Sequence, residues 1–143
     1  METQTCSVVE LRIPARPEFV SVARLGVSAI ANMMNFGYDV IDDIKLAVGE
    51  ACTNAILHAL APGEHEVAEI TIRCRLEIDS LTIEVHDSGV GCDFEELPRE
   101  LDVESLPEAG YGLLLINAIM DEMQCVTSPE TGTVVRMVKR ARQ

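Results

Sequence analysis

Residues 70–85, ITIRCRLEIDSLTIEV, contain the pattern that decides the fold. Apolar side chains alternate with polar ones from Ile70 onward, and the alternation resumes at Leu81. A period of two places the apolar side chains on one face of a β-strand. Asp79 and Ser80 interrupt the two runs and favour a turn. The stretch therefore predicts an antiparallel hairpin with one apolar face.

Helices and further strands are predicted on both sides of this hairpin. Strands are predicted over residues 7–13, 125–128 and 133–138. Helices are predicted over residues 17–36, 39–60 and 112–123, with Pro17 in the first turn and Asp39 as a cap. Residues 87–110 have weak periodicity and are expected to form a long loop. This order of elements predicts an α+β fold, a two-layer sandwich in which three helices cover one face of a mixed, mostly antiparallel sheet.

Length and charge limit the classes of function. The chain has 143 residues, so we expect a single domain over residues 1–143. Its 11 Lys+Arg and 24 Asp+Glu give a net charge of −13. A general nucleic-acid binder needs a basic surface to neutralise phosphates, so direct nucleic-acid binding is not expected. An acidic surface suits a basic protein partner, or it only keeps the protein in solution.

The cysteines and the apolar stretches indicate the compartment. The five cysteines are widely spaced and form neither a CxxC pair nor a zinc-type cluster with histidine. Free thiols are typical of a reducing compartment, so the expected location is the cytoplasm. The first residues, METQTCSVVELRIP, lack the basic and apolar regions of a signal peptide. No apolar stretch approaches about 18 residues, so no membrane span is expected.

Residues 50–58, EACTNAILH, place polar side chains on one face of the second predicted helix. Glu50, Asn54 and His58 are four residues apart and therefore share that face. The helix is otherwise apolar, and a carboxylate among buried neighbours costs stability unless it is paired or used. Such a carboxylate can act as a general base, and a nearby amide oxygen can help to hold Mg²⁺. A polar stripe at the edge of the core explains the same pattern.

Two glycine motifs follow. Asp87 ends a predicted strand, where its carboxylate can accept a hydrogen bond from an exocyclic amine. Gly89 and Gly91 come next and allow a flat ligand to approach the backbone. Gly110 and Gly112 open the third predicted helix, where free N–H groups and the helix dipole favour a phosphate. Taken alone, each motif is also compatible with an ordinary turn or a tight helix entry.

The order of the motifs is more specific than any one of them. Along the chain the sequence has Glu-x-x-x-Asn, Asp-x-Gly-x-Gly, Gly-x-Gly-Leu and finally Gly-Thr, at residues 50–54, 87–91, 110–113 and 132–133. This series resembles the N box and the glycine boxes of the GHKL ATPase superfamily, which includes gyrase, the MutL proteins and histidine kinases. Within that superfamily the chain is similar to the stand-alone anti-sigma factor serine kinases of the RsbW type. The similarity is carried by residues 50–55, 58–59, 110–113 and 120–122.

The resemblance implies a Bergerat-type fold that binds ATP and Mg²⁺. It implies that Glu50 is the general base, that Asn54 coordinates Mg²⁺ and contacts the nucleotide, and that Asp87 binds the adenine amino group. Residues 91–110 would form a mobile lid. The other implied nucleotide-binding positions are Gly89, Gly91, Gly110, Tyr111, Gly112, Leu113 and Thr133.

The implied function is that of an ATP-dependent protein-serine kinase. It would sequester a sigma factor and phosphorylate a STAS-type anti-anti-sigma protein, and it is expected to form a homodimer. One alternative is a nucleotide-gated protein-binding module without phosphotransfer, which would not need Glu50. Another is a detached histidine-kinase catalytic domain, although no helix pair carrying a phosphoacceptor histidine is recognisable in the sequence.

Overall fold

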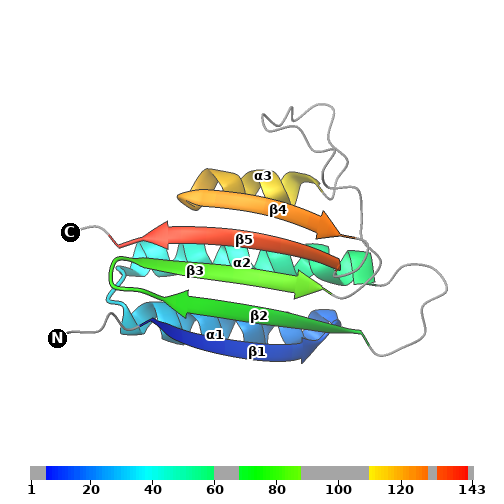
Figure 1. The fold of residues 1–143 in the computed structure, drawn as a ribbon, viewed down its shortest axis with the longest axis horizontal. Coiled ribbons are helices and arrows are strands. Elements are labelled where there is room, and N and C mark those ends of the chain that lie inside the picture. Colours follow the sequence, from blue (N-terminus) through cyan, green and yellow to red (C-terminus); the bar gives the residue numbers. More distant parts are fainter. Residues whose placement is uncertain (1–5, 60–67, 88–109, 129–131, 142–143) are drawn as a thin grey trace.

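The computed structural model describes residues 6–59, 68–87, 110–128 and 132–141. A five-stranded sheet lies against three helices, which all cover the same face (Figure 1). In chain order the elements are β1 (Ser7–Pro14), the short 3-10 helix η1 (Pro17–Phe19), α1 (Val20–Met33), α2 (Tyr38–Ala59), β2 (Glu69–Leu76), β3 (Ser80–Asp87), α3 (Gly110–Ile119), β4 (Glu122–Ser128) and β5 (Gly132–Arg140). The predicted α+β two-layer architecture is confirmed.

The sheet has the strand order β1-β2-β3-β5-β4, and its four strand pairs are all antiparallel. The chain leaves the sheet after β3 and returns through α3 to the edge strand β4, before β5 closes the gap between β4 and β3 (Figure 1). The ends of β3 and β5 therefore meet in the middle of the sheet. This placement brings Asp87, the first residue of the first glycine motif, next to the last hairpin.

The core lies between the sheet and the helices. Alternate strand residues such as Ile72, Ile83 and Met137 are at most 1% exposed, and Ile44 of α2 is fully buried against them. Burying one such side chain contributes about 1.5–3 kcal/mol, so this layer supplies most of the stability. The opposite residues of the same strands face away from the helices, as the period of two requires.

The turn from α1 to α2 is fixed by a backbone cap. Asn35 has a φ of 63°, the left-handed conformation that often ends a helix. Its N–H donates to the carbonyl of Asn32, and the N–H of Phe36 donates to the carbonyl of Ala31. This double hydrogen bond ends α1 and directs the chain into α2.

Some predicted element ends were wrong. The third helix ends at Ile119 and not at Met123, and Glu122 and Met123 belong to β4. The helix ends there because Asp121 and the residues after it pair with β5, and the Lys139 side chain donates to the Ile119 carbonyl, which the helix end leaves without an intrahelical partner. The hairpin strand β2 ends at Leu76, and α2 begins at Tyr38, so Asp39 lies in its first turn.

Candidate nucleotide-binding site

Asp87 and Thr133 lie directly opposite each other at the ends of β3 and β5. Their side chains are 2% and 3% exposed, although both are polar. Both point to the helix layer, because each alternates with a neighbour on the open face of the sheet. The sequence motifs predicted these two positions separately, and the antiparallel register of β3 and β5 brings them together.

A small hollow lies beside this pair, between α2 and the centre of the sheet. It has a volume of about 190 Å³ including its open mouth. Its lining consists of Ala51, Asn54, Ala55, Val85, Asp87, Thr133 and Val135. The lining divides into an apolar and a polar part, and both α2 and the sheet contribute to each: the alanines and Asn54 come from α2, and the valines, Asp87 and Thr133 come from β3 and β5. A flat heterocycle with an exocyclic amine matches this division, because the amine needs an acceptor and the ring needs apolar contact.

The first turn of α3 contacts the polar face of α2. A methyl group placed on Gly112 would lie 2.8 Å from Glu50 Oε1 and 3.5 Å from Asn54 Nδ2. Only a residue without Cβ leaves the Glu50 carboxylate where it is. The structure thus brings together Glu50, Asn54 and Gly112, which come from two of the predicted motifs.

Glu50 is half-buried, and it makes no hydrogen bond or ion pair with any other residue that the structure describes. Its carboxylate lies at the N-terminal end of α3, where the N–H groups of the first turn have no partner within the helix. A carboxylate placed in this way keeps both oxygens available to a substrate hydroxyl or a water.

Asn54 is 5% exposed, and its Nδ2 has no hydrogen-bond partner among the described residues. A buried amide nitrogen without a partner costs about 1–3 kcal/mol, so a ligand is its natural partner. A half-turn of the amide exchanges its oxygen and nitrogen, which allows it to offer an oxygen to Mg²⁺. In the described ranges no three His, Cys, Asp or Glu side chains form a metal-binding group. A nucleotide-bound Mg²⁺ takes most ligands from phosphates and water, so one amide oxygen fits this role.

The remaining predicted positions fall into three groups. Gly89 and Gly91, like the proposed lid, lie outside the described residues. Gly110 and Tyr111 open α3, in the turn that contacts Glu50. The side chain of Leu113 is 1% exposed and belongs to the hydrophobic core, so it can reach a nucleotide only through its backbone.

Sequence reasoning missed the apolar part of the hollow. Ala51 and Ala55 count among the apolar residues of the second predicted helix, and Val85 and Val135 are positions in predicted strands. The available signal was the spacing of Ala51 and Ala55, which are four residues apart and flank Asn54 on the same side of α2. Small side chains at these two positions leave space next to the sheet.

Comparison with known proteins agrees with this geometry. The family model of the histidine kinase-like ATPase domain matches residues 13–139. A serine-protein kinase RsbW of Bacillus cereus is 44% identical over 138 residues, which cover 92% of this chain and 83% of that protein. An RsbW of Bacillus thuringiensis subsp. konkukian is 43% identical with the same coverage. The chain therefore belongs to the histidine kinase-like ATPase family, in the group of the RsbW serine-protein kinases. No helix in the described ranges is long and apolar enough to cross a membrane.

Proposed function

We propose that the protein is an ATP-dependent protein-serine kinase that phosphorylates a STAS-type anti-anti-sigma protein and sequesters a sigma factor. The observation that carries the proposal is the Glu50 carboxylate, held at the first turn of α3 beside Asn54. The RsbW relatives, which are named serine-protein kinases, support the same reaction.

The hollow accounts for adenine recognition in this proposal. The Asp87 carboxylate accepts a hydrogen bond from the adenine amino group, and Thr133 lies directly opposite it. Ala51 and Ala55 contact the ring face. Because Asp87 and Thr133 are buried, a purine that offers a carbonyl oxygen in place of the amino group would meet the Asp87 carboxylate with another acceptor.

In this proposal the phosphates of ATP lie at the start of α3. Free N–H groups of its first turn bind phosphate oxygens, and the helix dipole adds a favourable field. The Asn54 amide helps to hold Mg²⁺, which neutralises charge on the phosphates when bound. Glu50 accepts the proton of the substrate serine hydroxyl. The hydroxyl oxygen then forms a bond to the γ-phosphorus, and the bond from that phosphorus to the bridging oxygen of ADP breaks.

The proposal also covers the protein partners and the assembly of the chain into a homodimer. A net charge of −13 is compatible with a basic partner such as a DNA-binding sigma factor. The homodimer is supported by an apolar surface on α1 and the edge strand β1, where Val9, Val22, Leu25 and Met33 are exposed. The buried free thiols Cys52 and Cys74 support a cytoplasmic location for this kinase. The proposal treats residues 1–143 as one domain.

The direct test is phosphotransfer from γ-labelled ATP with Mg²⁺ to a STAS-type protein from the same organism. We expect the label on one serine of that protein, and replacing that serine by alanine should abolish labelling. Binding of ATP without any labelling would contradict the kinase proposal. It would favour a protein-binding module that responds to the nucleotide.

A further inference from the structure

The face of the sheet that the helices leave open carries a group of arginines. On this face the antiparallel register aligns one residue from each strand across the middle of the sheet. The row consists of Glu10, Arg73, Glu84, Arg136 and Gln124. Alternating charges in such a row are the usual cross-strand pairs of a solvated sheet face and explain most of its residues.

Arg75 is not explained by this pairing. Its cross-strand partners are Val8 on β1 and Thr82 on β3, and it has no ion pair with any residue that the structure describes. An arginine between an apolar and a neutral side chain gains no cross-strand stabilisation from its charge. Arg75 is exposed, and its charge remains available to a ligand.

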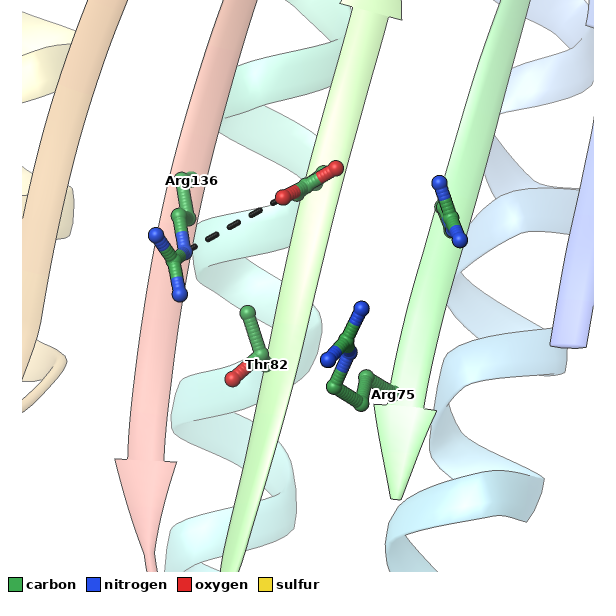
Figure 2. A pocket seen from close by; sticks show the side chains of 5 residues that line it. Arg75, Thr82 and Arg136 are labelled. Carbon is green, nitrogen blue, oxygen red and sulfur yellow. Dashed lines mark ion pairs between the residues drawn. The ribbon is translucent and has the colours of Figure 1, made fainter. Parts of the chain in front are cut away.

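Arg75 shares a hollow with the charged row. The hollow has a volume of about 490 Å³ including its mouth, and it is lined by Arg73, Arg75, Thr82, Glu84 and Arg136. Arg75 and Arg136 approach it from the two sides of β3, with Thr82 between them (Figure 2). The lining has two positive charges in excess, although the whole chain is strongly acidic.

The guanidinium groups are weakly engaged. Arg73 Nε lies 3.7 Å from Glu10 Oε2, and Arg136 Nε lies 3.9 Å from Glu84 Oε2. Both distances exceed hydrogen-bond length, so these contacts leave the N–H donors available. The other oxygen of Glu84 lies 2.8 Å from His86 Nε2. The Glu84 carboxylate is therefore shared between two partners, which weakens its interaction with Arg136.

The spacing of the arginines selects the kind of ligand. Along β2 the backbones of Arg73 and Arg75 are about 7 Å apart, and the backbone of Arg136 lies two strands from that of Arg73, about 10 Å. A single phosphate is too small to engage all three without drawing the side chains together. Carboxylates spaced along a peptide match these distances, and each fits the fork of one guanidinium.

We propose that this hollow is a docking site for an acidic segment of a protein partner. It uses the face of β3 and β5 opposite to Asp87 and Thr133, so an occupant does not compete with the nucleotide. The inference does not depend on phosphotransfer, because its residues are separate from those of the proposed kinase site.

The test uses a labelled peptide of alternating Glu and Ser, with the Gln-for-Glu peptide as its uncharged control. Fluorescence anisotropy at low salt should show binding of the Glu peptide alone. Replacing Arg75 (Arg75→Gln) should weaken binding about tenfold, the effect of losing one charged hydrogen bond. Arg16→Gln removes the same charge beside Glu18, away from the hollow, and should leave peptide affinity within about twofold. ATP affinity should not change in either variant.

Three results would overturn the proposal. Equal losses for Arg75→Gln and Arg16→Gln would mean that only overall charge matters. Displacement of the peptide by an equal concentration of inorganic phosphate would indicate a small-anion site. Self-association of the wild-type chain that Arg75→Gln abolishes would assign the face to a second copy.

Discussion

Gly112 of α3 lies against the carboxylate of Glu50 on α2, so closely that a methyl group on Gly112 would be 2.8 Å from Glu50 Oε1. The contact joins the start of α3, the proposed phosphate-binding helix, to the proposed general base. The obstructed atom is the end of a flexible side chain, so an added methyl group would displace the carboxylate without disrupting the backbone. In the proposed mechanism Gly112 therefore keeps Glu50 in position, in addition to allowing the phosphate to approach the backbone.

Gly112→Ala should separate stability from activity. Alanine is a better helix former than glycine by about 1 kcal/mol, which offsets the cost of moving Glu50. The free energy of unfolding should change by less than about 1 kcal/mol. Phosphotransfer should fall about 100-fold, because a displacement of roughly 1 Å is enough for such a loss. Denaturant unfolding and single-turnover transfer measure the two effects.

Two controls accompany Gly112→Ala. A Cβ on Gly37 would meet nothing within 4 Å, so Gly37→Ala should leave transfer unchanged. In a Glu50→Asp background the shorter side chain removes the clash, so Gly112→Ala should cause little further loss. Full additivity of the two substitutions would show that Gly112 acts independently of the carboxylate.

Asp87→Asn should weaken ATP binding. The variant keeps the size of the side chain but places an amide opposite the adenine amino group. Mispairing of a buried polar group costs about 1–3 kcal/mol, or about 5- to 150-fold in affinity. Calorimetry measures the loss, with Asp79→Asn in the β2–β3 turn as the matched control. Wild-type affinity in Asp87→Asn would remove this residue from the nucleotide site.

Much of this site was accessible from the sequence, because its parts are local. The Glu50–Asn54 pair depends on helical spacing, and Asp87 depends on the end of a strand. The cross-strand pairing of Asp87 with Thr133 was not accessible, because it needs β5 to insert between β3 and β4. The arginine hollow was missed for the same reason, since Arg136 joins Arg75 only through that strand order. The end of α3 was misplaced because Met120 and Met123 continue a helical pattern until pairing with β5 prevails.

Buried thiols should govern the response to alkaline pH. Burial raises the pKa of the Cys52 thiol to about 12 and that of Cys74 to about 11, from 9.0. The unfolded chain ionises these thiols from about pH 9, whereas the folded chain keeps them protonated. Their contribution to stability is therefore complete below pH 9 and is lost as the pH rises toward 11 and 12.

Thiol labelling checks that Cys52 and Cys74 are buried in the folded protein. At pH 8 an alkylating reagent should modify the exposed Cys6 rapidly, while Cys52 and Cys74 should react only on unfolding. Peptide mapping by mass spectrometry identifies the modified positions. Rapid modification of Cys52 in the folded protein would contradict its burial in the hydrophobic core.

The cap of α1 offers a stability test away from the site. Asn35 adopts a φ of 63°, which costs a residue with an ordinary Cβ about 1 kcal/mol or more. Asn35→Ala should lower the free energy of unfolding by about that amount, and Asn35→Gly should not lower it. Thermal or urea unfolding of both variants measures the difference, and ATP affinity should remain that of the wild type.

The most direct measurement of the central claim is Glu50→Gln, compared with the wild type for ATP binding and for phosphotransfer on the same preparations. Glutamine keeps the shape and the hydrogen-bonding capacity of the side chain but cannot take a proton. We expect ATP affinity within about threefold of the wild type, and transfer to the STAS-type protein reduced at least 100-fold. Transfer at the wild-type rate would contradict the assignment of Glu50 as the general base and, with it, the mechanism proposed for this kinase.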